Sequence, residues 1–458
     1  MHDESSLKRS ALLVATLAAF ITPFMGSAVN VALPSIGKEF AMDAVLLSWV
    51  PTAYLLAAAI LVVPFGRVAD MMGRKKVFAF GMSVFTAGSL LSALSVSATM
   101  LVVARALQGV GGAMIFGTGV AILTSVFPPH ERGRALGINV AAVYVGLSVG
   151  PFAGGFLTEQ LGWRSIFAMM VPLGVLMVII LLWKLKGEWA DAKGAKLDVP
   201  GTMLYSTTLV AIMYGFSQLP HALGASLLAG GILGLLLFVR WERKAESPLV
   251  NMDLFRYNRV FAFSNLAALI NYSATFAVGF LLSLYLQYIK GFNPQQAGLV
   301  LVAQAAVMAG GSPFAGRLSD RMEPRIVASA GMGFIVVGLS FLAFLSETTP
   351  LWMIIAALVL LGVGFALFSS PNTNAVMSSV ERSSYGVAAG TVATMRMTGQ
   401  MFSLGIVMLI FALGMGRVQI VPEYYGQFLL SVRIAFGIFA VLCFGGVFAS
   451  LARGTVRR

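Results

Sequence analysis

The stretch Gly66–Lys76 reads GRVADMMGRKK and lies between two apolar runs of membrane-spanning length, roughly residues 46–64 and 77–96. An ionic side chain at the centre of a bilayer costs about 2.5–3.5 kcal/mol on insertion scales, so the five charges of this stretch cannot lie in hydrocarbon. The stretch is therefore predicted to form a tight polar turn at one membrane face. Gly66 and Gly73 would let the two helix ends approach closely there.

The same pattern recurs at an offset of 250 residues. Residues 316–321 read GRLSDR, which matches the stretch that begins at position 66, and again they follow an apolar run. The pair Glu131-Arg132 recurs as Glu381-Arg382 at the same offset. Three matched features at one offset indicate two homologous halves, an organisation typical of transporters.

Composition places the chain among all-α polytopic membrane proteins. Its 458 residues are 58% hydrophobic and 11% charged, whereas soluble proteins carry about 25% charged residues. The net charge of +13 comes from basic residues clustered in short loops beside apolar runs, a pattern that indicates membrane topology and not nucleic-acid binding. The single cysteine, Cys443, excludes disulfides and cysteine metal sites, and we expect no metal or cofactor.

Apolar runs long enough to cross a bilayer, about 20 residues each, number fourteen. With a cytoplasmic N-terminus, the even-numbered turns and both tails hold 24 of the 31 Lys and Arg residues, against 5 on the opposite side. The positive-inside rule then predicts a multi-pass protein of the cell (inner) membrane with both termini cytoplasmic. The runs begin near Ala11, Leu46, Val77, Met100, Ala135, Ile166, Val199, Ala225, Val260, Gln296, Ile326, Leu351, Gly386 and Leu430.

The repeat divides these runs into three parts. Residues 1–187 are predicted to form an N-terminal six-helix bundle and residues 251–458 a C-terminal one. Residues 188–250 would form a linker that carries an inserted pair of helices, because its two apolar runs have no partner at the 250-residue offset. The alternative is a twelve-span chain with an apolar linker.

Small residues and a proline interrupt the fifth apolar run. Gly146 and Gly150 are four residues apart, and Pro151 follows Gly150 directly. Glycines at this spacing let a second helix approach to backbone contact, and the proline removes a helix hydrogen bond and permits a bend. The segment is either a closely packed, kinked helix or a pivot between two conformations of a transporter.

Two arginines lie inside apolar runs, each with a glutamine one turn away. They are Arg105, with Gln108, and Arg396, with Gln400. A buried arginine must face the protein interior, water or a partner group. Each arginine therefore either bonds to the carbonyls of a neighbouring helix or recognises a charged substrate. The polar residues Asn30, Tyr54, Gln304 and Asn372, also within apolar runs, either line a cavity or bond neighbouring helices.

Three motifs together resemble those of the major facilitator superfamily. Gly66–Lys76 resembles its loop signature, Leu101–Gly109 its fourth-helix signature, and Gly146–Gly155 the fifth-helix signature of its exporters. The resemblance implies two six-helix bundles with a central cavity between them and transport by alternating access.

Further residues resemble the fourteen-helix drug:proton antiporter branch of this superfamily. They are Asn30–Pro34, Trp49 and Tyr54 near the N-terminus and Thr394–Gly399 near the C-terminus. The branch resemblance implies export of amphiphilic toxic compounds in exchange for protons. This sequence departs from the branch at Met25, where an acidic residue is expected, and its Asp and Glu residues all fall in tails, loops or helix ends.

The missing carboxylate bears on the substrate. A pocket for lipophilic cations needs a buried acid to pair with the charge, and here the residues inside the spans offer only positive charge. We therefore expect a small neutral or anionic amphiphile as substrate, with protons as a candidate coupling ion and the lipid bilayer as the surrounding partner. A uniporter or importer of a specific organic anion is the alternative.

A membrane enzyme or receptor is the more remote alternative. The sequence has no clustered His, Cys or acidic constellation at one membrane face and no Gly-x-x-x-x-Gly-Lys-Ser/Thr nucleotide loop. We expect a monomeric secondary transporter and not an enzyme. The residues predicted to form its conformational switch are Gly66, Arg67, Asp70, Gly73, Arg74, Asp320, Gly146, Gly150 and Pro151.

Overall fold

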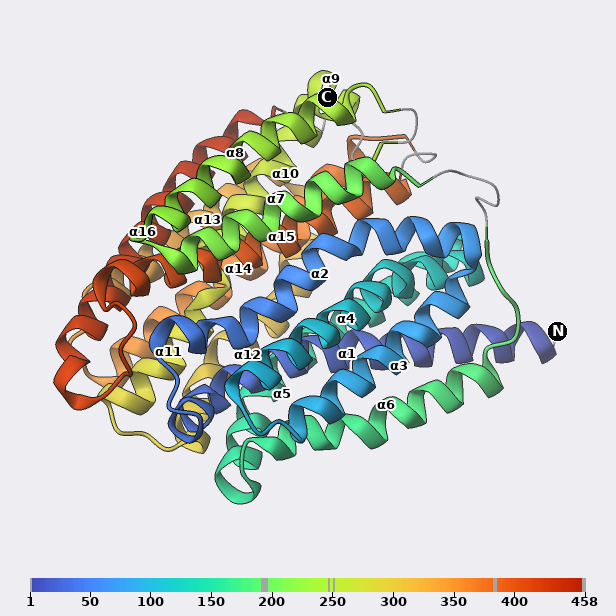
Figure 1. Ribbon diagram of the computed structural model, residues 1–458. Helices are drawn as coiled ribbons and strands as arrows, with labels where there is room; N and C mark the ends of the chain where they lie inside the picture. Colours follow the sequence, from blue (N-terminus) through green and yellow to red (C-terminus); the bar gives the residue numbers. More distant parts are fainter. Residues whose placement is uncertain (1, 191–196, 246–247, 250–251, 382–384, 455–458) are drawn as a thin grey trace.

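The computed structural model describes residues 2–190, 197–245, 248–249, 252–381 and 385–454, and in these ranges it contains helices and no strand (Figure 1). The all-α fold predicted from composition is confirmed. The first six long helices are α1 (His2–Glu39), α2 (Ala44–Met72), α3 (Arg74–Ala93), α4 (Ala98–Val126), α5 (Pro129–Leu161) and α6 (Arg164–Lys184).

The remaining helices follow a connector after α6. They are α7 (Val199–Gln218), α8 (Ala222–Glu242), the short α9 (Met252–Tyr257), α10 (Arg259–Thr275), α11 (Ala277–Leu284), η1 (Tyr285–Ile289), α12 (Pro294–Arg321), α13 (Pro324–Leu342), α14 (Leu351–Ser378), α15 (Tyr385–Gly414), η3 (Pro422–Tyr424) and α16 (Tyr425–Ala452). Helices α10, α11 and η1 run on as one span, Arg259–Ile289.

Polar residues just before several helices explain where those helices begin. Asp43 accepts a hydrogen bond from the Leu46 N–H at 2.7 Å and so caps α2. Asn293 and Gln296 form a capping box at the start of α12. Such caps satisfy the backbone N–H groups that a first helical turn leaves without partners.

Thirteen helices of the described chain are long and apolar enough to cross a membrane, against the fourteen predicted. The difference is α7, which has 20 residues but falls outside the thirteen. Hydroxyl groups lower its hydropathy, and two of them, on Thr202 and Ser206, donate to carbonyls one turn back in the chain. The helix packs along α8, so the two form the predicted hairpin.

The two halves of the chain repeat one packing scheme. In the first half α1 packs on α5, α2 on α4, and α3 on both α4 and α6. In the second half α10 packs on α15, α12 on α14, and α13 on both α14 and α16. Figure 1 shows the first half in blue to blue-green, ending with α6, and the second in yellow-green to red, with α7 and α8 in brighter green beside the second. The boundaries at residues 187 and 250 stay a prediction.

Both termini lie at the same ends of the helices in Figure 1. We call this side of the molecule the terminal face and the opposite side the far face. Near the far face the two bundles are joined by backbone and side-chain contacts. Gln287 of η1 donates to the Val31 carbonyl of α1 at 2.9 Å, and the Ala44 N–H donates to the Val418 carbonyl at 3.1 Å.

Candidate functional site

Five side chains from the two bundles meet near the middle of their helices. The Arg396 guanidinium of α15 lies over the Phe116 ring of α4, 5.8 Å from its centroid. Tyr272 of α10 is a neighbour of both Arg396 and Ser369. Ser369 of α14 also accepts a hydrogen bond from the Tyr144 hydroxyl of α5 at 3.3 Å. We call these five residues the Arg396 cluster.

Local packing explains why these side chains come together. Gly399 lies one turn after Arg396, and a Cβ there would lie 2.7 Å from the Leu269 carbonyl oxygen of α10. The missing side chain therefore lets α10 approach α15 closely enough for Tyr272 to reach Arg396. Tyr272 also packs edge-on against Phe365 of α14, with ring centroids 5.5 Å apart.

The charge of Arg396 is not neutralised within the described part of the chain. The ion pairs found there are Lys8–Glu131, Arg74–Asp70 and Arg164–Glu39. The Arg396 side chain is only half-buried, as are those of Gln400, one turn further along α15, and Gln304 of α12. A cation of this kind with hydroxyl neighbours can bind an anion where the two bundles meet.

The second predicted arginine, Arg105, lies instead inside the N-terminal bundle and is 1% exposed. Its Nε donates to the Val50 carbonyl of α2 at 3.1 Å, and its guanidinium donates to Gln108. Gln108 in turn donates to the Ser89 hydroxyl of α3 at 2.7 Å. Arg105 also stacks on the Tyr54 ring, 4.7 Å from its centroid. These contacts match the helix-bonding interpretation of Arg105 and Gln108.

The other polar candidates lie in three different places. Tyr54 is buried beneath Arg105, and Asn372 donates to the Ser264 carbonyl of α10 at 3.2 Å inside the C-terminal bundle. Asn30 lies at the contact between the bundles, where its amide nitrogen would be 3.9 Å from a Cβ on Gly279 of α11. Of these three, Asn30 is the one that faces the opposite bundle.

The predicted switch turn is held within the N-terminal bundle. Arg74 donates from Nε to the Asp70 carboxylate at 2.8 Å and also donates to the Ser125 hydroxyl. The connector after α6 covers the turn, because Glu188 accepts from the Lys75 N–H at 2.8 Å. Gly73 adopts φ 118°, a conformation that favours glycine. A Cβ at Gly73 would also collide with Glu188.

Two more members of the predicted switch lie at the same turn, and one lies in the other half. Arg67 is exposed. Gly66 packs against Gly117 of α4, and a Cβ added at Gly117 would lie 3.2 Å from the Gly66 nitrogen. The side chain of Asp320 lies outside the described residues.

The glycines and proline of α5 contact both bundles. Gly146 and Gly150 press against the α1 backbone, where an added Cβ at Gly150 would lie 2.8 Å from the Phe24 carbonyl. On another side of α5, the Pro151 carbonyl meets Gly298 of α12 so closely that a Cβ on Gly298 would collide with it. Helix α5 is thus the main contact between the bundles together with α12.

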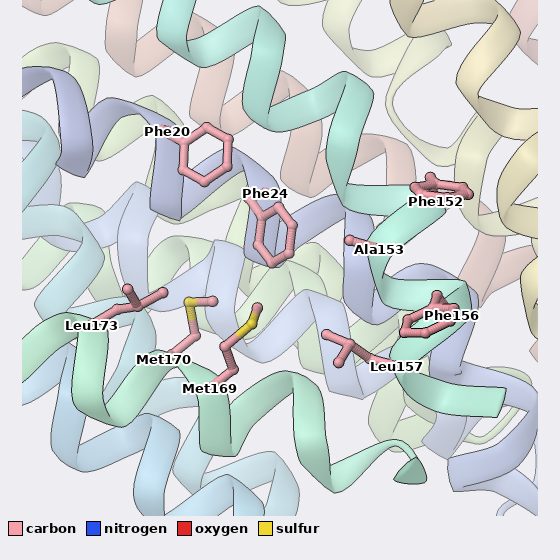
Figure 2. Close-up of a pocket in the computed structure, with 9 residues that line it drawn as sticks. All are labelled: Phe20, Phe24, Phe152, Ala153, Phe156, Leu157, Met169, Met170 and Leu173. Carbon is pink, nitrogen blue, oxygen red and sulfur yellow. The ribbon is translucent and has the colours of Figure 1, made fainter. Parts of the chain in front are cut away.

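A separate groove of about 390 Å³ lies between α1, α5 and α6 (Figure 2). Its lining is wholly apolar and includes Phe24, Phe156 and Met170. Phe156 is also exposed, so the groove reaches the surface of the protein. It contains none of the predicted site residues, and we do not assign it to the substrate.

The fold and the site define a membrane transporter built from two related helix bundles. The chain belongs to the Major Facilitator Superfamily, whose family model matches residues 15–404 and, in a second match, 264–457. Members of this family are transporters, so the chain is not an enzyme.

Relatives with curated names support the same class. The cephamycin export protein CmcT of Amycolatopsis lactamdurans is 34% identical over 99% of this chain and 95% of that protein. The riboflavin transporter RibZ of Clostridioides difficile is 30% identical over 95% of both. The puromycin resistance protein pur8 of Streptomyces alboniger is 32% identical over 87% of this chain and 80% of that protein.

A solved structure shows the same fold. A bacterial homologue of the human lysosomal transporter Spinster, in an inward-facing and occupied conformation, superposes with a TM-score of 0.71 at 15% identity. The match covers 98% of this chain and 97% of that one. The major facilitator fold predicted from the motifs is therefore confirmed, whereas the fourteen-helix branch stays a prediction.

Sequence reasoning missed four members of the Arg396 cluster, namely Phe116, Tyr144, Tyr272 and Ser369. The sequence of an apolar run does not reveal whether an aromatic or hydroxyl side chain in it faces lipid, the core or a cavity. Met25, the position of the expected carboxylate, is 1% exposed and belongs to the hydrophobic core. Arg396 is the one member of the cluster that is also among the eight residues predicted to line the cavity.

Proposed function

We propose that the chain exports small amphiphilic compounds in exchange for protons, by alternating access, from the cytoplasmic side of a cell membrane. The observation that carries the proposal is the arrangement of contacts between the bundles. Near the far face they are joined through Gln287–Val31 and Ala44–Val418. The half-buried Arg396 cluster lies between the bundles, deeper toward the terminal face. This is the arrangement expected of a carrier closed on one side.

The cytoplasmic side is assigned from charge. In the proposed orientation the terminal face is cytoplasmic, because most basic residues fall there. The far face then faces outward, and the chain described above is closed to the outside. Single cysteines at positions 220 and 291, in a Cys443→Ala background, should react with an impermeant maleimide added to intact cells. Reaction only after the cells are opened would reverse the orientation.

Export is favoured over import by the named relatives, two of which are an export protein and a resistance protein. Proton coupling follows from the branch resemblance and not from a carboxylate within a span. The turn around Asp70 and the glycine–proline segment of α5 are proposed as the parts that move, as in other carriers whose packed elements switch between two arrangements.

The test is transport by the purified protein in liposomes, with anionic, neutral and cationic amphiphiles and with or without a pH gradient. An acidic lumen should raise accumulation of the substrate, and a protonophore should abolish the gain. Equal uptake with and without the gradient would instead establish the alternative, a uniporter of an organic anion. Accumulation driven only by external acid would establish an importer.

A further inference from the structure

We propose that the Arg396 cluster recognises an organic anion in which a carboxylate is attached to a planar aromatic ring. This inference rests on the proposed transport function and adds the chemical class of the substrate. It concerns residues of both bundles, Phe116 and Tyr144 from the first and Tyr272, Ser369 and Arg396 from the second.

The position of the guanidinium sets the charge that the site accepts. Arg396 lies 5.8 Å from the Phe116 ring centroid, within the range of a cation–π contact. The N–H donors of a guanidinium lie in one plane, and the ion pairs of the described residues do not involve Arg396. The planar fork of these donors matches the two oxygens of a carboxylate.

The hydroxyl groups beside Arg396 complete the recognition of the anion. Tyr272 is a neighbour of both Arg396 and Ser369, and Tyr144 donates to Ser369 at 3.3 Å. A hydroxyl can turn to donate to an incoming oxygen because it is both donor and acceptor. Each of these side chains is half-buried, so the site is partly desolvated without being sealed.

Arg105, the other arginine predicted inside an apolar run, differs from Arg396 in burial, hydrogen-bond partners and location. Arg105 is 1% exposed, and its donors are used by Val50 and Gln108 of its own bundle. Arg396 is half-buried, lies between bundles and forms no ion pair within the described chain. The first arrangement holds a fold together, and the second leaves donors for a ligand.

The aromatic side chains set the shape that the site accepts. Phe116 lies on one side of the guanidinium, and the Tyr272 ring packs edge-on with Phe365 at 5.5 Å between centroids. A flat ring on the ligand can replace or extend these contacts by stacking. An aromatic pair contributes more binding free energy than the burial of its apolar area alone. A carboxylate on an aliphatic chain would gain the ionic contact without the stacking.

The test measures binding to the purified full-length protein in lipid nanodiscs with four probes. They are 1-naphthoate, the neutral 1-naphthamide, the cationic 1-naphthylmethylammonium and the aliphatic cyclohexanecarboxylate. We expect 1-naphthoate to bind at least tenfold more tightly than each of the other three. Arg396→Lys should keep part of this preference because it keeps the charge, and Arg396→Gln should lose it.

Two further variants and one control test the neighbours. Tyr272→Phe removes a hydroxyl and should weaken 1-naphthoate severalfold while leaving 1-naphthamide unchanged. Phe116→Leu removes the ring and should bring 1-naphthoate closer to cyclohexanecarboxylate. Arg433→Gln is the matched control, because this arginine of α16 donates to the Ala343 carbonyl outside the cluster, and it should change nothing.

The outcomes separate this inference from the transport proposal. Equal binding of all four probes, or a charge preference that survives Arg396→Gln, would overturn the inference even if transport of amphiphiles responds to a pH gradient. If Arg396→Gln does not fold, unchanged selectivity in Tyr272→Phe and Phe116→Leu would overturn it equally. Loss of gradient-driven transport for every amphiphile, with 1-naphthoate still bound selectively, would overturn the transport proposal alone.

Discussion

Tyr144 of α5 donates a hydrogen bond from its hydroxyl to the Ser369 hydroxyl of α14 across 3.3 Å, and so links the two bundles beside Arg396. Neither residue belongs to a motif that sequence analysis singled out. The contact lies deeper in the molecule than the far-face contact between Gln287 and Val31. It joins parts that must separate or shift if the bundles move against each other.

Removing this link should alter the transport cycle and not the stability of either bundle. A hydrogen bond of this kind contributes about 0.5–1.5 kcal/mol, so Tyr144→Phe should change the transport rate by about two- to tenfold. Its thermal midpoint should stay within 2–3 °C of the parent, which corresponds to about 1 kcal/mol for a domain of 150–250 residues. The control is Tyr257→Phe, an exposed tyrosine of α9. An unchanged rate in Tyr144→Phe would show that the link has no part in the cycle.

Arg105 should stabilise the N-terminal bundle. Arg105→Gln leaves the Val50 carbonyl and Gln108 without their partner, and an unsatisfied buried polar group costs about 1–3 kcal/mol. The measurement is thermal unfolding in detergent, where Arg105→Gln should lower the midpoint clearly and the half-buried Arg396→Gln only slightly. A changed substrate profile with an unchanged midpoint would place Arg105 in the cavity.

Asp70 should affect the rate of the cycle and not the affinity for substrate. Its carboxylate pairs with Arg74 at the turn between α2 and α3, away from the Arg396 cluster. Asp70→Asn should therefore slow transport about tenfold while binding of the substrate stays within a few-fold of the parent. Binding lost in a folded Asp70→Asn protein would contradict a switching role.

The close contact between α5 and α12 should tolerate no added side chain. Gly298→Ala would drive its Cβ into the Pro151 carbonyl, whereas Gly310→Ala in the same helix meets no atom within 4 Å. We expect Gly298→Ala to reduce transport at least tenfold or to lower the thermal midpoint, because backbone here must move to make room. Gly310→Ala should behave as the parent. Equal behaviour of the two variants would show that α5 and α12 are not tightly packed in the working protein.

Much of the fold could be predicted, since its signals are local. Apolar runs, glycine turns and basic loops report the spans and their order, and the 250-residue repeat reports the two halves. The count was the exception, because the Ser, Thr and Tyr residues of α7 reduce its hydropathy although it packs as a full helix on α8.

The site was harder to predict because its partners are far apart in the chain. Arg105 and Arg396 look alike in sequence, since each lies in an apolar run near a glutamine. The partner that identifies Arg105 as a contact between helices, the Val50 carbonyl, lies 55 residues before it. Tyr144 and Ser369 are 225 residues apart. No periodicity or composition relates such positions, so the cluster became visible only once the bundles were placed together.

The most direct test of alternating access is the distance between spin labels on the two faces. In a Cys443→Ala background, one pair of labels replaces Met72 and Met322 on the terminal face, and another replaces Val96 and Trp352 on the far face, all exposed positions. Saturating substrate or a change of pH should shorten the first distance and lengthen the second. Two distances that stay constant, or that change in the same direction, would contradict the account.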